Sequence, residues 1–365
     1  RTVAERVADI VEQGWNVVLT HGNGPQVGFV MRRSELADGQ VAPVALDYAG
    51  ADVQGAVGYM FCKALRNVFR RRGLPGEPIA LVAQALVDRD DPAFARPGKP
   101  IGSWFDRETA ERLALLHGWS IVEDAGRGWR RVVPSPEPRA IVELEPIRHL
   151  VRQGYLTVTL GGGGIPVIRN QQGDLEGVEA VIDKDLSSSL LARRLGADML
   201  ILPTGVDHVA LRFNTPDETW LDSMTVARAR AYIRADEFAK GSMEPKVRAL
   251  ADFVEASGGT GIITSLDRMG DALRGRAGTR IVPRRTGASP PIPPGKMLHR
   301  GGLSSRRSRQ GPWASARAGG VFFSWPVFCN IAVAETTQGR SAARLFSSLS
   351  WSGTAWGLSS VVFCR

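Results

Sequence analysis

The sequence contains few cysteines and no long apolar segment, and each shortage excludes a class of protein. Its three cysteines, Cys62, Cys329 and Cys364, lie far apart and form no CxxC motif. This spacing is typical neither of a disulfide-linked secreted domain nor of a zinc site, and it favours the reducing cytoplasm. No run of about 18 apolar residues is present that could span a bilayer. The first residues also lack the basic-then-apolar order of a secretory signal, so we expect a cytoplasmic protein with no membrane partner.

Acidic residues are almost absent from one end of the chain, and this shortage explains the net charge of +9. From Arg284 to Arg365 there are eleven basic residues and one acid, Glu335, whereas residues 1–283 carry 35 basic and 36 acidic residues. The basic character therefore belongs to the C-terminal segment alone. Residues 1–283 give no electrostatic reason to expect a nucleic-acid partner.

The first 283 residues repeat one order of elements: an amphipathic helix, a glycine and a mostly apolar strand. The strands read NVVLT, YLTVTL, DMLILP and GIITS. Short apolar strands are typical of a sheet that is buried on both faces, and alternation with helices implies parallel pairing through right-handed crossovers. The pattern predicts an α/β fold, an αβα sandwich around a doubly wound, mainly parallel sheet. Such sheets bind ligands at the carboxyl ends of their strands.

Two segments depart from this order. Residues 88–131 place several prolines and glycines ahead of a polar helix near residues 105–117, and we interpret them as a small inserted lid beside the sheet. Residues 284–365 are rich in Arg, Gly, Ser and Pro, and we expect them to be disordered. This tail could be a real extension or out-of-frame translation of a GC-rich gene, and its composition favours the second. The predicted domains are therefore residues 1–283 and the tail.

Two glycine-rich loops are candidates for a functional site. His21–Gly28 follows the first strand, and its glycines let backbone N–H groups face an anion beside the positive end of the next helix. A tight turn explains the same residues equally well. Gly161–Gly164 follows a later strand, and four successive glycines indicate the close approach of a ligand or of another backbone.

Two helix starts carry charged candidates. Asp185 precedes an apolar helical face and is a candidate N-cap, but Lys184 beside it could direct its ammonium group toward a phosphate. Lys246 falls in the first turn of another helix, where its charge opposes the helix dipole. A bound polyanion removes this objection, and a solvated lysine is the alternative.

Glycine loops together with lysines organised by an aspartate are suited to phosphoryl transfer. In that reaction the protein mainly positions the reactants and offsets charge. No GxxxxGK[ST] motif is present, so we do not expect a P-loop enzyme. No spacing of His, Asp and Glu predicts a metal site built by the protein itself.

Eight segments within residues 1–283 follow one another in an order that is typical of one enzyme family. They read THGNGPQVG, DRDDPAF with KPIG, GWRRVVPSP, GGGGIPV, VIDKDLSSSLLA, PTGVDHV, GSMEPKV and AGTRIV. In these segments the chain resembles carbamate kinase, of the amino-acid kinase superfamily. The resemblance implies an αβα sandwich that acts as a homodimer, with a nucleotide-binding part near residues 181–283. It also implies reversible phosphoryl transfer between MgATP and carbamate, giving MgADP and carbamoyl phosphate, in the breakdown of arginine or purine derivatives.

The resemblance also implies two sets of binding residues. The carbamate and phosphoryl pocket would be lined by Gly22, Asn23 and Gly24. The cofactor would be ATP or ADP with Mg²⁺, the metal being held mainly by the nucleotide phosphates. The nucleotide would be surrounded by Thr204, Gly205, Val206, Asp207, Gly241, Ser242 and Met243.

Four further positions would act in catalysis. The resemblance implies that Lys99 reaches in from the lid and that Lys184 and Lys246 neutralise the transferring phosphoryl group. Asp185 would hold the lysines in place. No general base is needed, because carbamate is already an anion and its oxygen can attack the γ-phosphorus directly.

The chain also departs from the family pattern at both ends. Family members begin with a strand that leads into a Gly-Gly-Asn phosphate loop, whereas Arg1 falls inside the helix that should follow it. We therefore expect a truncated member whose missing first strand leaves exposed sheet edges. The resemblance stops near Val282, so the tail is unrelated to it. Two alternatives stay open: a catalytically inactive remnant, or another member of the superfamily that acts on a different small anion.

Overall fold

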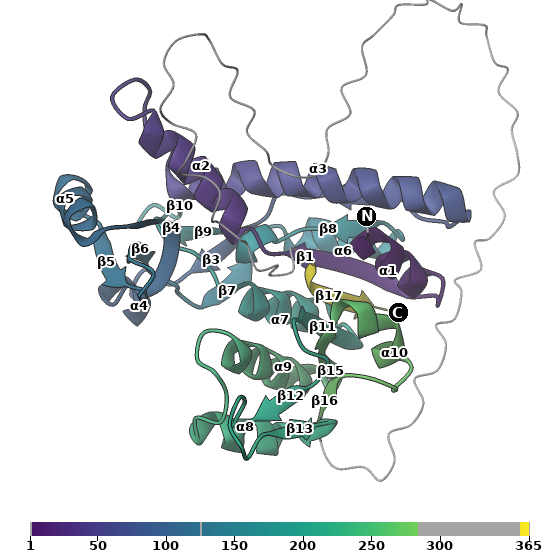
Figure 1. Ribbon diagram of the computed structural model, residues 1–365. Coiled ribbons are helices and arrows are strands. Elements are labelled where there is room, and N and C mark those ends of the chain that lie inside the picture. Colours follow the sequence, from purple (N-terminus) through teal and green to yellow (C-terminus); the bar gives the residue numbers. More distant parts are fainter. Residues whose placement is uncertain (1, 125, 284–357, 365) are drawn as a thin grey trace, which may run out of the picture. The chain divides into compact units, whose positions relative to one another are not determined.

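A computed structural model describes residues 2–124, 126–283 and 358–364, and its largest element is an eight-stranded sheet (Figure 1). Across the sheet the order is β14 (Ser223–Thr225), β16 (Thr279–Val282), β15 (Thr260–Ser265), β11 (Met199–Thr204), β17 (Leu358–Cys364), β1 (Asn16–His21), β8 (Leu156–Val158) and β2 (Pro78–Ala80). Pairing is parallel between β14 and β16, between β15 and β11, and along β1, β8 and β2. The α/β fold with a mainly parallel sheet is therefore confirmed.

Helices cover both faces of this sheet, because successive residues of each strand point to opposite sides. In β11, Met199 and Ile201 join one buried cluster while Leu200 and Leu202 join the other. The first cluster includes residues of α1 (Thr2–Val11), α3 (Leu46–Arg72) and α10 (Met269–Leu273). The second includes residues of α6 (Leu144–Arg152), α7 (Lys184–Leu195), α8 (Val226–Arg234) and α9 (Met243–Ser257). Within the described ranges, no helix is long and apolar enough to cross a membrane.

The helix–glycine–strand order has a conformational cause. α7 ends at Gly196 and α9 ends at Gly258, with φ of 69° and 71°, and β11 and β15 follow within three residues. This left-handed backbone is disfavoured for residues that carry a Cβ atom, so glycine ends each helix at a defined residue and turns the chain back into the sheet.

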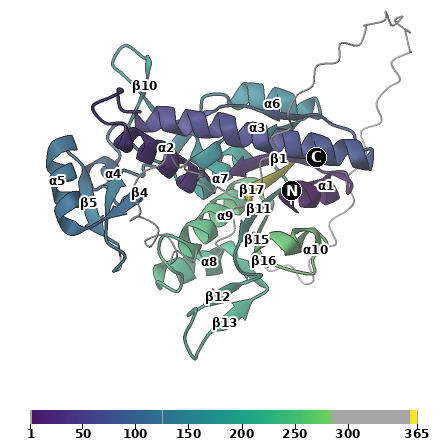
Figure 2. The ribbon, with the colours of Figure 1, turned by 45° about the horizontal axis from the view of Figure 1, so that its top comes forward.

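The segment interpreted as a lid forms a small antiparallel sheet of its own, in the order β4 (Lys99–Phe105), β6 (Trp129–Val133), β5 (Ser120–Glu123). The one-turn helix α4 (Pro92–Ala95) precedes it, and α5 (Arg107–His117) connects β4 to β5. Figure 2 shows β4, β5 and α5 grouped together. The guanidinium groups of Arg127 and Arg130 lie over the ring of Trp104, 5.4 and 4.7 Å from its centre, and connect β4 to β6 and to the turn before it.

Several elements have no counterpart in the sequence-based prediction. A second, four-stranded sheet has the order β10 (Leu175–Gly177), β9 (Ile165–Arg169), β3 (Gln84–Val87), β7 (Pro138–Ile141). A hairpin joins β12 (Val209–Leu211) to β13 (Thr219–Leu221). The short elements η1 (Gly161–Gly163) and η2 (Leu266–Arg268) also have no counterpart, whereas α2 (Gly24–Leu36) is the helix expected after the first glycine loop. The 27-residue α3 was not predicted either.

Strand β17 corrects the expectation for the tail. It lies between β1 and β11 and is antiparallel to both, with Asn16 opposite Cys364 and Met199 opposite Phe363. Val361 and Val362 are fully buried on opposite faces of the sheet. Residues 358–364 are therefore ordered, and β1 and β11 are not exposed edges, because each has a hydrogen-bonded neighbour on both sides. The expectations for residues 284–357 lie outside the described residues.

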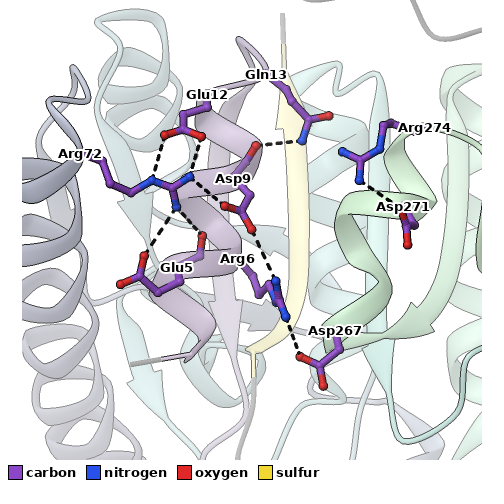
Figure 3. A network of polar contacts seen from close by, with 9 residues as sticks. All are labelled: Glu5, Arg6, Asp9, Glu12, Gln13, Arg72, Asp267, Asp271 and Arg274. Atoms are coloured by element: carbon purple, nitrogen blue, oxygen red, sulfur yellow. Dashed lines mark hydrogen bonds and ion pairs between the residues drawn. The ribbon is translucent and has the colours of Figure 1, made fainter.

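Ion pairs hold α1 against its neighbours (Figure 3). Near the end of α3, the Arg72 guanidinium lies 2.5 Å from a Glu12 carboxylate oxygen and 2.8 Å from one of Asp9. From α1 toward η2, the Arg6 guanidinium lies 3.3 Å from a carboxylate oxygen of Asp267. The hydrogen bonds to Glu12 and Asp9 raise the pKa of Arg72. These contacts join α1 to elements on both of its sides over one face of the sheet.

Candidate functional site

Two glycine-rich loops meet at the carboxyl ends of β1 and β8. His21-Gly22-Asn23 follows β1 and leads into α2, and Gly161–Gly163 follows β8 as η1. A Cβ atom on Gly161 would collide with the His21 ring, and one on Gly162 would collide with the side-chain amide of Asn23. Glycine is therefore required where the two loops touch.

The rest of the four-glycine run is packed in the same way. A Cβ atom on Gly163 would lie 2.8 Å from the carbonyl oxygen of Ile182, and one on Gly164 would lie 3.0 Å from Cβ of Ala85. Of the two explanations for four successive glycines, close approach to other protein atoms accounts for all four positions.

The start of α7 binds the second glycine loop and the end of β1. The Ser187 hydroxyl donates to the carbonyl oxygen of Gly163 at 2.6 Å. The hydroxyl groups of Ser188 and Thr20, near the end of β1, share a hydrogen bond of 2.8 Å. All three side chains are buried. The helix start is therefore fixed against Gly161–Gly163 and against the strand that leads into the first glycine loop.

The N-cap of α7 is Asp183, and the interpretation of Asp185 as the cap is wrong. The carboxylate of Asp183 accepts a hydrogen bond of 2.9 Å from the backbone N–H of Asp185. This arrangement satisfies one of the N–H groups that a helix start leaves unpaired. Because Asp183 provides the cap, the Asp185 side chain is available for other contacts.

Asp185 joins the two lysines of the helix starts. Its Oδ2 accepts a hydrogen bond of 2.8 Å from Nζ of Lys246, in the first turn of α9, and its Oδ1 lies 3.7 Å from Nζ of Lys184. Asp185 is only 3% exposed and Lys246 only 8% exposed. Burial lowers the pKa of Lys184, and the neighbouring Asp185 opposes that effect. The pair brings Lys246, 61 residues away in sequence, to the start of α7.

Lys99 of the lid reaches the same helix start. Its Nζ lies 3.3 Å from Oδ2 of Asp183. Burial acts to raise the pKa of Asp183, but Lys99 and the N–H of Asp185 together hold it below its ordinary value. Three ammonium groups are therefore arranged with two carboxylates, Asp183 and Asp185, around one turn of α7. Sequence analysis gave no role to Asp183, although its place in the Asp-Lys-Asp triplet is the signal that could have indicated one.

His21 lies beneath the first loop. Its side chain is buried, and burial lowers its pKa although the backbone oxygen of Gly22, 3.0 Å from Nδ1, acts in the opposite sense. Its ring centre lies 5.9 Å from that of Phe61. Packing against Phe61 and Gly161 gives His21 a structural role in shaping the loop.

The expected nucleotide residues lie on two other segments. Thr204 ends β11, and Gly205, Val206 and Asp207 form the turn that follows it. Gly241-Ser242-Met243 leads into α9, three residues before Lys246. Ser242 is the N-cap residue of α9, but its side chain makes no capping hydrogen bond.

Metal-ligating side chains are not clustered in the described ranges, where no group of three or more His, Cys, Asp or Glu residues could hold an ion. The charged groups of the site are instead three lysines with two aspartates. This excess of positive charge at the carboxyl ends of parallel strands suits a phosphate-bearing ligand.

Comparison with known proteins gives a consistent result. Residues 1–265 match the model of the amino acid kinase family. The chain is 47% identical over 286 residues to a carbamate kinase of Thermococcus kodakarensis, covering 77% of this chain and 90% of the relative. A carbamate kinase of Pyrococcus horikoshii is 45% identical over 285 residues, covering 78% and 90%.

A solved structure is similar as well. The carbamate kinase from Giardia lamblia, bound to AMP-PNP, superposes with a TM-score of 0.73 at 42% sequence identity, covering 77% of this chain and 89% of that one. This chain therefore belongs to the amino acid kinase family, and within that family to the carbamate kinases.

Proposed function

We propose that this protein catalyses reversible phosphoryl transfer between MgATP and carbamate, giving MgADP and carbamoyl phosphate. The observation that carries the proposal is the buried contact of Asp185 with Lys246, with Lys184 beside it at the start of α7. Two ammonium groups that a carboxylate holds in place can stabilise the negative charge of a transferring phosphoryl group, and the carboxylate itself does not react. The two relatives compared above, which are 47% and 45% identical to this chain, are carbamate kinases.

In the proposed reaction, an oxygen of the carbamate anion attacks the γ-phosphorus of ATP. A new P–O bond forms, the bond to the ADP oxygen breaks, and its electron pair leaves with the β-phosphate. No proton has to be removed from the nucleophile. The chain's contribution is to align the two anions against the loops at Gly22–Gly24 and to offset their charge with Lys99, Lys184 and Lys246.

We assign the nucleotide to the segments Thr204–Asp207 and Gly241–Met243. Gly241–Met243 leads directly into the first turn of α9, which carries Lys246 of the charged site, and AMP-PNP is bound by the Giardia lamblia relative. Mg²⁺ would enter the site with the nucleotide and be held mainly by its phosphates. The site supports this because its charged side chains are three lysines and only two aspartates.

We also propose that the protein is a cytoplasmic homodimer. The exposed large side chains Tyr48 and Tyr59 lie about three helical turns apart on α3, a spacing that places them on the same helical face, and exposed Met60 follows Tyr59. Apolar side chains gathered on one exposed face favour burial against a second copy. Sedimentation equilibrium tests this: we expect twice the mass of the chain, and a monomer at micromolar concentration would contradict the proposal.

The direct test is ATP formation from MgADP and carbamoyl phosphate by the full chain. We expect ATP with carbamoyl phosphate and little with acetyl phosphate, and a loss of about 10²-fold or more in Lys184→Met and Lys246→Met. Lys240→Met is the matched control, because the Lys240 side chain is 73% exposed and pairs with Asp236, four residues earlier. Equal rates with acetyl phosphate would favour a different small anion, and no rate with either donor would favour an inactive remnant.

A further inference from the structure

Lys99 stands at the base of the lid, where the backbone is fixed but the side chain is not. It begins β4 opposite Val133 of β6, which is 2% exposed and packs in a buried cluster with residues of α2 and α3. The Lys99 side chain itself is 38% exposed. An exposed lysine samples many rotamers, so its ammonium group needs a partner to hold one position. That partner is Asp183, at 3.3 Å.

Each carboxylate oxygen of Asp183 accepts a different hydrogen bond. Oδ1 accepts the backbone N–H of Asp185 and caps α7, whereas Oδ2 accepts the hydrogen bond from Lys99. Its side chain is 16% exposed. Because the cap fixes the orientation of the carboxylate against the helix, the position of Oδ2 is fixed as well, and with it the place where Lys99 can be held.

The charge of this carboxylate also interacts with two positive groups. Lys99 and Lys184 both act on the pKa of Asp183 through their charges. Two ammonium groups that face one anion site repel each other while the site is empty. A carboxylate beside both of them offsets that repulsion before substrate arrives.

We propose that Asp183 is a positioning residue for the reaction, because it holds Lys99 of the lid beside the start of α7 before the phosphoryl group binds. The inference rests on the function proposed above and extends it to a residue that does not contact the reacting atoms. The anion then meets three ammonium groups already in place, two of them set by Asp185 and the third by Asp183. Groups arranged in advance need no reorganisation when the reaction occurs.

Two substitutions separate positioning from capping. Asp183→Asn keeps a good helix cap but removes the charge, whereas Asp183→Glu keeps the charge and is the poorer cap. We expect Asp183→Asn to lower kcat/KM for carbamoyl phosphate by about 10-fold or more with little change in Tm, and Asp183→Glu to retain more activity. A role in capping alone predicts the reverse order of activities.

A double-variant cycle tests whether the effect passes through Lys99. Asp183→Asn combined with Lys99→Met should be no less active than Lys99→Met alone, because the same interaction is lost once. Asp106→Asn is the control: it caps α5 in the lid through the N–H of Thr109 at 2.8 Å and should leave kcat/KM unchanged. Losses that add in the double variant, or wild-type kcat/KM in Asp183→Asn, would overturn the proposal.

Hydrogen exchange provides a readout that does not depend on turnover. If Asp183 holds the base of the lid through Lys99, the amides of β4 should exchange faster in Asp183→Asn and in Lys99→Met, and at the wild-type rate in Asp106→Asn. Unchanged exchange in Asp183→Asn would contradict the positioning role even in an active enzyme. Absence of ATP formation by the wild-type chain would instead contradict the proposed function, leaving the contact itself to be judged by exchange.

Discussion

Replacement of Asp185 by Asn tests the centre of the site most sharply. The substitution keeps the size of the side chain but removes a charge whose oxygens lie 2.8 Å from Nζ of Lys246 and 3.7 Å from Nζ of Lys184. The side chains of Asp185 and Lys246 are 5% and 10% exposed, so water cannot replace the lost carboxylate easily. The variant therefore leaves a buried ammonium group without its counter-ion.

The expected cost follows from this burial. Removing one partner of a buried ion pair destabilises a protein by about 3–5 kcal/mol. For a domain of this size, that corresponds to a fall in Tm of roughly 6–20 °C. Because both lysines lose the group that positions them, we also expect ATP formation from carbamoyl phosphate to fall by about 10²-fold or more.

Thermal unfolding followed by circular dichroism, together with the coupled ATP assay, measures both effects. Asp271→Asn is the control. Asp271 of α10 also pairs with arginines, but at the surface (Figure 3), so its replacement should leave Tm nearly unchanged. The double variant Asp185→Asn, Lys246→Met should regain stability, because the stranded ammonium group is gone, but not activity. An Asp185→Asn protein with wild-type Tm and wild-type rate would refute the reasoning.

Two further predictions concern the same site. In Gly162→Ala, the new Cβ atom would collide with the Asn23 amide, and the residue has a φ of 68°. We therefore expect a loss of stability of about 1–2 kcal/mol or more and a raised KM for carbamoyl phosphate. Gly173→Ala is the control: Gly173 has a φ of 90° but open space around it, so this variant should lose stability without a change in KM. Because burial lowers the pKa of Lys184, its charge is lost at a lower pH than that of an ordinary lysine, and activity should decline as pH rises through that pKa. In Lys184→Arg the guanidinium stays charged, so the alkaline limb of the pH–rate profile should move to higher pH, and an unmoved limb would exclude Lys184 as its source.

The sequence was most informative where structure is set locally. The helices that end at Gly196 and Gly258, and the strands after them, were predicted because amphipathic period and terminal glycine act within one segment. The long helix α3 was missed because glycines in its interior oppose helix formation. One of them, Gly58, packs so closely on β2 that a Cβ atom would lie 2.7 Å from Cβ of Ala80, and this tertiary contact overrides the local preference.

Contacts between distant segments were the harder part of the site. The approach of Lys246 to Asp185 was expected only through the family resemblance, because 61 residues separate them. The role of Asp183 was missed because Asp185, two residues later, fits the pattern of an N-cap equally well. The pairing of β17 with β1 could not be foreseen either: residues 358–364 fall in the tail that was expected to be disordered, and their sequence does not indicate which strands will be their neighbours.

The place of β17 also determines the order in which the molecule can be completed. The groups β2-β8-β1 and β11-β15-β16-β14 share no hydrogen-bonded pair in the described sheet and are joined through β17 alone. Thr20 and Ser360, which lie side by side across this junction, are 340 residues apart in sequence. Closing so long a loop costs entropy before any contact compensates it, and such contacts slow folding. On the ribosome, the two groups of strands can each form early, but they can be joined into one sheet only after residues 358–364 have been synthesised.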